Sequence, residues 1–384
     1  MAMHTSPLSS RKVVPLDGVR GIAILAVFLS HSVWRIESTS AIQQVLKWFY
    51  SLGWAGVDLF FVLSGFLITG ILLDSRLAEN YFQSFYARRA LRIFPLYCAF
   101  LLVAFTLFPY LVAADWMPVS RDRWVYLCYL TNWLALWKGP WRHSVMAHLW
   151  SLAVEEQFYF CWPLLVWVLR PGVLLPTLLA GEAAVVVGRI WWVLIHGASQ
   201  AVALSTVTRM DGLLLGAVCA ILVRHWRIPD RLVRRLPWLA GGGFYLYVML
   251  AFRFRVPDAF NQTVGFPLLA VCFALVVLYA VLTEGSASPA QWFLCWRPLT
   301  NVGKYAYGIY VFHVPLLYFG DNLIARFVPP AVRASTWFGY ASIAVLFVVS
   351  YQMAKFSYNF FERRFLNWKD RFAARYAREA AMAA

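Results

Sequence analysis

Long apolar runs recur along the chain, separated by short polar segments. Each run approaches the ~20 residues that a helix needs to cross a bilayer. A shorter apolar stretch, 124–137, could span, re-enter or lie at the interface. The pattern predicts an all-α polytopic membrane protein. The ten predicted spans are 16–36, 53–73, 91–112, 148–169, 173–195, 203–223, 236–252, 264–283, 301–320 and 338–360.

Basic residues decide how 124–137 is interpreted. With ten spans and an inside N-terminus, the inside loops hold about twice as many basic residues as the outside loops, as the positive-inside rule requires. An eleventh span at 124–137 would move the dense basic cluster at 224–235 to the outside. We therefore expect ten spans and a short re-entrant or interfacial segment. Both termini are expected to be cytoplasmic, in a multi-pass protein of the inner (plasma) membrane.

The composition agrees with a membrane protein. Hydrophobic residues make up 61% of the chain and charged residues only 14%, whereas soluble domains have about 25% charged residues. The net charge of +16 would suggest nucleic acid in a soluble protein. Here the basic residues lie mainly in loops, and no nucleic acid partner is expected. The cysteines form no CxxC pair, so neither a disulfide nor a metal site is expected.

The first apolar run carries Arg20 near one end and His31 near the other. They are eleven helical steps apart, which is about three turns with roughly 20° left over, so both side chains point the same way. The helical rise separates them by roughly 16 Å. Ionisable groups inside a membrane are costly and usually mark function. The shared face favours a functional pair over a signal anchor with two tolerated polar residues.

Other ionisable residues fall at comparable depth in the predicted spans. Buried charges need partners, so we expect some of them to meet His31 in the outer half of the membrane. Adjacent glutamates on a helix are about 100° apart, so only one of the two can face His31 squarely. The expected partners are Glu155, Glu156, Asp211 and His313, and further candidates for binding a substrate are Asp58 and Tyr310.

Structural alternatives stay open for several of these residues. His313 precedes Pro315 by two positions and could bond only to a backbone carbonyl that the proline leaves free. Arg209 and Asp211 could form an ion pair that serves packing alone. Tyr310 could be an interior hydrogen-bonding residue.

An arginine cluster marks the inner side. Arg88, Arg89 and Arg92 stand where the third span begins, and residues three or four apart share a helix face. Guanidinium groups are always charged and bind phosphate in a bidentate manner. Arg20, at the inner end of the first span, would complete an anion site. The alternative is ordinary positive-inside anchoring.

Six motifs, in order, resemble acyltransferase family 3 of integral membrane O-acyltransferases. The resemblance runs from about 14 to 362, so 1–384 is expected to form a single membrane domain with its core at 14–362. The motifs are LDGVRGIAILAVFLSH with its Arg-x10-His spacing, GVDLFFVLSGFLI, FYARRALRIFP, LWSLAVEEQFY, RMDGLLLG and YGIYVFHVP.

The resemblance implies transfer of an acyl group, usually acetyl, from cytoplasmic acyl-CoA to a hydroxyl. Acceptors in the family are mostly sugars, such as O-antigen, exopolysaccharide or peptidoglycan. The resemblance also implies that His31 and Arg20 are an essential pair and that Arg89 and Arg92 match the family's arginine pair. Some members append an outer hydrolase-like domain. The chain ends soon after its last predicted span, so we expect it to lack one.

The residues themselves fit this chemistry. Transfer to a hydroxyl needs a base to take its proton, and His31 is the best placed. Glu155 or Glu156 could fix its tautomer and stabilise the imidazolium. Direct transfer and a route through an acylated His31 both stay open. The expected partners are acetyl-CoA or another acyl-CoA, the lipid bilayer and a carbohydrate or glycolipid acceptor. The alternative function is a proton-coupled transporter of an anionic or sugar substrate.

Overall fold

The structure, a computed structural model, is mainly helical in the residues that it describes. These are 13–36, 40–111, 122–138, 145–253 and 258–376, and they contain no strand. Six segments are long and apolar enough to cross a membrane. Many large apolar side chains on the outer helices are exposed, for example Leu102, Leu194 and Val348. An apolar exterior of this kind is what a lipid environment requires, and the chain is a multi-pass membrane protein.

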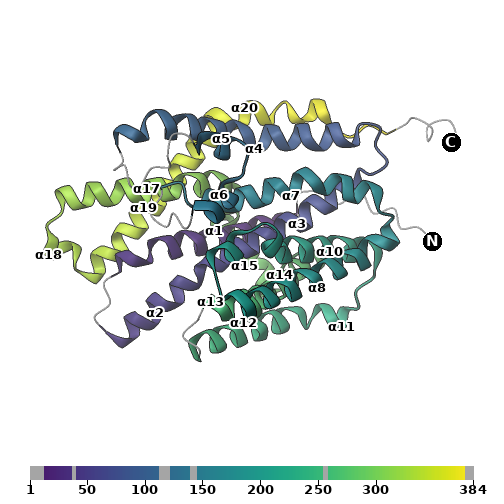
Figure 1. Ribbon diagram of the computed structural model, residues 1–384, viewed down its shortest axis with the longest axis horizontal. Coiled ribbons are helices and arrows are strands. Elements are labelled where there is room, and N and C mark those ends of the chain that lie inside the picture. The colour runs from purple at the N-terminus through teal and green to yellow at the C-terminus, as the bar shows by residue number, and fades with distance from the viewer. Residues whose placement is uncertain (1–12, 37–39, 112–121, 139–144, 254–257, 377–384) are drawn as a thin grey trace.

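Each predicted span overlaps one helix of 16 residues or more. The fold is built around these long helices, and shorter helices connect them (Figure 1). The long helices are α1 (Val14–Ser32), α3 (Gly56–Asp74), α4 (Tyr81–Thr106), α7 (Leu149–Val168), α8 (Pro171–His196), α10 (Met210–His225), α12 (Leu236–Arg253), α14 (Phe266–Leu282), α17 (Ala306–Phe327) and α19 (Thr336–Ser357).

Most of the connecting helices are too short to cross a bilayer, for which ~20 residues are needed. They are α2 (Ala41–Ser51), α5 (Arg123–Leu127), α6 (Thr131–Lys138), α9 (Gln200–Leu204), α11 (Asp230–Val233), α13 (Asp258–Phe260), α15 (Pro289–Leu294), α16 (Arg297–Lys304), α18 (Pro330–Arg333) and α20 (Arg363–Leu366). The apolar stretch 124–137 therefore forms two short helices, α5 and α6, neither of which is long enough to cross a bilayer by itself.

Several predicted boundaries were wrong. The span expected at 203–223 starts only at Met210, because Thr208 donates its hydroxyl to the carbonyls of Val202 and Ser205 and the chain turns there. Such side-chain bonds to the backbone compete with helix formation. The span expected at 301–320 is split between α16 and α17 at Tyr305, whose backbone is not helical (φ −100°, ψ 8°).

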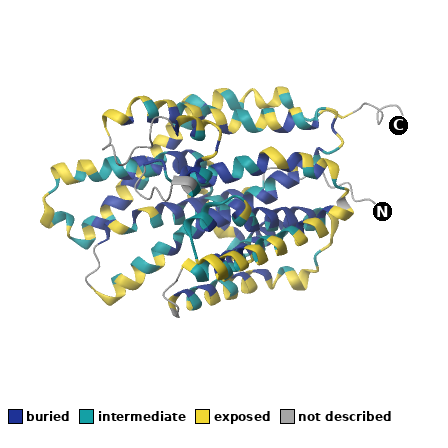
Figure 2. Ribbon diagram, viewed as in Figure 1, coloured by how far each residue is buried: buried dark blue, intermediate teal, exposed yellow. Residues whose placement is uncertain are grey.

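Helix α1 lies in the middle of the molecule, with α4 and α20 along one edge and α12 along the other (Figure 1). Its glycines allow very close packing. A Cβ atom on Gly18 would overlap the carbonyl of Leu294, and one on Gly303 in α16 would overlap the carbonyl of Asp17. Small residues at helix interfaces are typical of membrane proteins. Buried residues concentrate on these central helices, and the outer helices present exposed faces (Figure 2).

Candidate functional site

A histidine cluster lies at one end of α1. His31, in the last turn of α1, and His313, in α17, place Nδ1 and Nε2 2.8 Å apart. Their ring centroids are 5.0 Å apart and the ring planes differ by 23°. The two nitrogens therefore lie between the ring centres, and the contact runs edge to edge. The expected meeting of His31 and His313 is confirmed.

His148, just before α7, completes the histidine cluster, which we define as His31, His148 and His313. Its ring centroid is 5.1 Å from that of His313, and its Nε2 donates to the carbonyl of Val311 at 3.2 Å. The Tyr310 hydroxyl donates to the carbonyl of His148 at 2.8 Å. These bonds fix the start of α7 against α17.

Tyr310 lies beside the histidine cluster, but its hydroxyl is already bonded. In addition to the bond to His148, it exchanges a 2.5 Å hydrogen bond with the hydroxyl of Ser151. The side chain is 6% exposed. These contacts match the alternative of an interior hydrogen-bonding residue, and they give no support to the predicted role in binding a substrate.

The glutamates of α7 do not bond to His31, which corrects the prediction that one of them faces it. Among the described residues, Glu155 Oε2 accepts from the hydroxyl of Tyr159 at 2.8 Å, and that hydroxyl also lies 2.9 Å from Ser64 Oγ. Glu156 interacts electrostatically with Arg89. The physical reason is that arginines compensate these carboxylates better than a neutral imidazole does.

Three arginines lie near one another, and two of them interact electrostatically with Glu155. We define Arg20, Arg89 and Arg92 as the arginine cluster. Arg20 bonds Asp17 at 2.7 Å. Arg89 lies over the Tyr159 ring, 4.1 Å from its centroid, and Arg92 is within electrostatic range of both other arginines. The expected convergence of α1 and α4 arginines is thus confirmed.

Arg88 does not join the arginine cluster. Its side chain is exposed, and among the described contacts none connects it to Arg20. It shares a face of α4 with Arg92, one helical turn away, but the interactions of Arg92 with Arg20 and Arg89 have no described counterpart for Arg88. The prediction that all three α4 arginines form one site is therefore corrected to Arg89 and Arg92.

Glu155 connects the two clusters. It interacts electrostatically with Arg89 and Arg20 on one side and with Tyr310 on the other. Polar side chains therefore continue from the arginine cluster through Glu155 and Tyr159 to the histidine cluster, parallel to α1. This arrangement gives an anion-attracting end, a histidine end and a polar connection between them.

A separate set of four charges forms the buried charge group, which we define as Asp58, Arg189, Arg209 and Asp211. Arg209 bonds Asp58 at 2.5 Å, and Arg189 bonds Asp211 at 3.0 Å. Each of the four is at most 2% exposed. The partners differ from the Arg209–Asp211 pair that the sequence suggested.

The buried charge group also corrects the expectation that Asp211 meets His31. Among the described contacts, none links Asp58 or Asp211 to the histidine cluster, and both carboxylates are bonded to arginines. One oxygen of each carboxylate, Asp58 Oδ2 and Asp211 Oδ1, has no hydrogen-bond partner among the described residues. The arginine bonds themselves give no support to the predicted role of these aspartates in binding a substrate beside His31.

Sequence reasoning missed three functional candidates. His148 stands at the predicted start of the fourth span, at the same depth as His31, and that shared depth was a usable signal. Arg189 was also detectable, as the lone arginine in the fifth predicted span. Ser64 gave no signal, because a single hydroxyl in an apolar run is ordinary.

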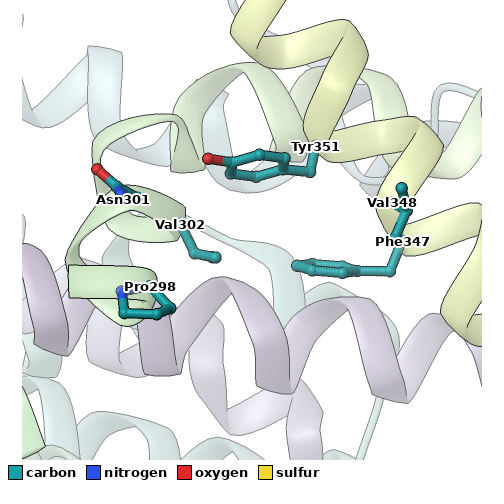
Figure 3. A pocket seen from close by; sticks show the side chains of 6 residues that line it. All are labelled: Pro298, Asn301, Val302, Phe347, Val348 and Tyr351. Atoms are coloured by element: carbon teal, nitrogen blue, oxygen red, sulfur yellow. The ribbon is translucent and has the colours of Figure 1, made fainter. Parts of the chain in front are cut away.

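An open pocket of about 370 Å³ lies between α16 and α19, lined by six residues (Figure 3). Its walls are mainly apolar, with the side chains of Val302 and Phe347 facing each other across it (Figure 3). No member of the histidine or arginine cluster lines it. Within the described part of the chain, no three His, Cys, Asp or Glu side chains are grouped so as to hold a metal ion.

Comparison with known proteins identifies the family of the chain. The acyltransferase-3 family model, an acyltransferase domain, matches residues 14–353. The chain belongs to acyltransferase family 3. Both clusters fall within this match, so the arrangement described above is that of an acyltransferase family 3 domain. No solved structure matches the chain.

The relatives of this acyltransferase family 3 chain include O-acetyltransferase OatA and a protein named "Putative O-acetyltransferase SACOL0978". It is 28% identical over 373 residues to O-acetyltransferase OatA of Staphylococcus aureus strains NCTC 8325 / PS 47 and COL, covering 92% of this chain and 57% of OatA. It is 26% identical over 399 residues to the protein SACOL0978 of strain COL, covering 96% of this chain and 61% of that protein. The chain thus spans about three fifths of the length of these relatives.

Proposed function

We propose that this chain is a membrane-embedded O-acyltransferase. It moves an acyl group, most simply acetyl, from cytoplasmic acyl-CoA to a hydroxyl of a carbohydrate or glycolipid acceptor. The observation that carries the proposal is the placement of Arg20 and His31 on one helix, each within a cluster of its own kind. Family membership and the O-acetyltransferase relatives support the reaction class.

The arginine cluster would hold the phosphates of the donor. Arg20, Arg89 and Arg92 bring three positive charges together with Asp17 and Glu155 as nearby acids. Like charges repel strongly where water is scarce, and a polyanion relieves that repulsion. Arginine also gives bidentate contacts to phosphate. The pantetheine arm would then lie along α1 toward His31, over the roughly 16 Å that the helical rise sets.

The histidine cluster would carry out the transfer. His31 takes the proton of the acceptor hydroxyl while its oxygen forms an ester bond to the acyl carbon. The carbon–sulfur bond of the thioester breaks, and the CoA thiolate leaves and receives a proton, so the products are an ester and free CoA. A two-step route in which His31 first takes the acyl group satisfies the same balance.

In this proposal all ten long helices cross the membrane and both ends of the chain are cytoplasmic. The N-terminal end of α1 and the start of α4 then face the cytoplasm, together with the arginine cluster. The histidine cluster lies toward the outer side. The acyltransferase domain works as one membrane unit.

A proton-coupled transporter is the less supported function. It explains neither an arginine cluster at the opposite end of α1 from an accessible histidine nor the family relationship. Membranes that contain the wild-type protein, incubated with labelled acetyl-CoA, should yield an alkali-labile acetyl ester on a glycan fraction. His225→Gln, which changes an exposed histidine at the end of α10, is the control and should retain the activity. Uptake of a sugar without acetylation would overturn the proposal.

The acceptor is found by a second experiment. Mass spectrometry of envelope glycans and exported metabolites, from cells with and without the protein, should show a product heavier by one acyl group only when the protein is present.

A further inference from the structure

The histidine cluster contains a directional chain of hydrogen bonds. His313 Nδ1 lies 2.6 Å from the carbonyl oxygen of Tyr310, and the carbonyl of Ile309 is a further backbone acceptor for this ring. His313 Nε2 lies 2.8 Å from His31 Nδ1. Each ring nitrogen of His313 thus has a defined partner.

The partners fix where the protons are. A carbonyl oxygen only accepts, so His313 Nδ1 must carry a hydrogen. A neutral imidazole has one N–H, so His313 Nε2 is unprotonated and accepts. His31 Nδ1 must then be the donor in the 2.8 Å bond. The hydrogen-bond partner of one ring nitrogen determines the tautomer of the ring.

A charged His313 does not fit this site. The side chain is 0% exposed, and among the described contacts no carboxylate bonds to it. An uncompensated charge in such a place is costly. The neutral form, with one acceptor nitrogen turned toward His31, is therefore the form that the surroundings favour.

The remaining nitrogen of His31 is the one available for chemistry. In contrast to His313, His31 is exposed. With Nδ1 donating to His313, Nε2 keeps its lone pair and lies on the part of the ring away from His313. This is the nitrogen that can take a proton from an acceptor hydroxyl or attack a thioester.

We propose that His313 is a positioning residue that holds His31 as its Nδ1–H tautomer and so presents Nε2 as the reactive nitrogen. The inference rests on the proposed function for the role of His31. It replaces the carboxylate orienter that general-base histidines often use with a second neutral imidazole. The orientation of that imidazole comes from a backbone carbonyl, which no protonation change can remove.

Two variants separate positioning from packing. His313→Gln keeps an amide oxygen able to accept from His31 Nδ1–H, whereas His313→Met keeps a similar bulk without a strong acceptor. We expect His313→Met to lower kcat by on the order of tenfold or more, as part of the 10²–10⁴-fold that a general base contributes. KM for acetyl-CoA should be unchanged, and His313→Gln should recover much of the loss. Equal kcat losses in both variants would overturn the proposal.

The tautomer itself is read by nitrogen NMR. The full chain, labelled with ¹⁵N-histidine and placed in lipid nanodiscs, gives the His31 signals as those absent from a His31→Asn sample. We expect a protonated Nδ1 and an unprotonated Nε2 in the wild type and in His313→Gln, and a shift toward Nε2–H in His313→Met. His225→Gln is the control and should leave the His31 signals in place.

An Nε2–H tautomer in the wild type, or an unchanged tautomer in His313→Met, would overturn the proposal. The NMR result stands apart from the acylation assay. Absence of acetyl transfer by the wild type would refute the proposed function, yet the wild-type tautomer would still decide the role of His313. If His313→Met does not fold, the wild-type and His313→Gln spectra decide it.

Discussion

His31 is accessible, while the histidine that bonds to it is completely buried. This difference in exposure gives the two rings different roles, since only an exposed ring can contact a substrate. His31 is thus the residue whose loss should affect chemistry most directly.

His31→Ala should abolish acyl transfer while the protein still inserts and folds. A general base contributes about 10²–10⁴-fold to the rate, and a nucleophilic role would contribute at least as much. The measurement is turnover of labelled acetyl-CoA per molecule of purified protein. Near-normal turnover by a folded His31→Ala protein would refute the assignment of His31.

Arg89→Ala and Arg92→Ala should each raise the KM for acyl-CoA more than the KM for the acceptor. Each lost charged hydrogen bond is worth about 1.5–3 kcal/mol. Lysine at either position should restore the affinity only partly, because it lacks the planar fork. The assay is donor titration at saturating acceptor.

Arg88→Ala is the matched control for the arginine cluster. It removes the same charge from the same helix, but Arg88 is exposed and lies outside the cluster. Its donor KM should stay at the wild-type value. If Arg88→Ala raised the donor KM as much as Arg89→Ala does, the arginines would act only through their total positive charge and not through specific contacts.

The sequence predicted one side of these contacts but not the other. Helical periodicity was enough to place Arg20 and His31 on one face of α1. The partner of His31 depended on how α7 and α17 rotate about their axes, and the sequence contains no direct measure of that rotation. From the sequence, a carboxylate was therefore as good a candidate for the partner of His31 as His313 was. In the structure, Glu155 interacts with Arg89 and Arg20 instead.

Helices α1 and α16 approach each other so closely that only glycine fits between them. Gly303→Ala should place a methyl group against the carbonyl of Asp17. Overpacking of a close interface lowers the free energy of unfolding by about 1–3 kcal/mol. The measurement is thermal unfolding in detergent.

Gly188→Ala, in α8, is the control for Gly303→Ala. Its added Cβ would meet no atom within 4 Å, and alanine favours a helix over glycine by roughly 0.5–1 kcal/mol. The Tm of this variant should stay level or rise. A drop equal to that of Gly303→Ala would show that glycine is needed in these helices for flexibility and not for close approach.

In the buried charge group, Arg209, just before α10, bonds Asp58 in α3, and these two partners should be strongly coupled. Arg209→Met leaves Asp58 buried without its bonded partner and should lower the free energy of unfolding by about 3–5 kcal/mol. Adding Asp58→Leu should recover much of that loss, because no isolated charge remains. A double-mutant cycle measures the coupling, and simple additivity of the two losses would contradict it.

At the level of elements, the sequence predicted where each long helix lies. The errors are at breaks inside apolar runs, as at Tyr305 between α16 and α17. A hydropathy window averages over roughly 19 residues and cannot register one non-helical residue. Hydrogen bonds from Thr208 to the backbone act in the same local way. Long-range packing and single turns therefore cannot be predicted from the mean polarity of a sequence window.

For the whole molecule, the separation of the two clusters along α1 predicts a sided reaction. The donor should enter at the arginine cluster from the cytoplasm, and the acceptor should meet the histidine cluster near the outer face. Vesicles of defined orientation, with impermeant acyl-CoA on one side and an impermeant acceptor analogue on the other, test this. Product should form only with the donor on the side of Arg89 and Arg92.

This sided reaction would require a path through the protein, because a polar group meets a large penalty in hydrocarbon. Reversing both compartments in the same vesicles is the control, and it should give no product. Efficient transfer with donor and acceptor both on the cytoplasmic side would refute the crossing, although acyl transfer itself would remain.

The bond between His31 and His313 joins residues 282 positions apart. Contacts between distant parts of a chain form late, because the intervening segment must be made and folded first. During synthesis α1 therefore enters the membrane long before α16 and α17 exist. Until then, its glycine face and its polar residues lack the contacts that those two helices provide. The His31–His313 contact is therefore assembled at the end of biogenesis. Under the proposed function, an unfinished chain released from the ribosome would be a membrane protein without a working acyl-transfer site.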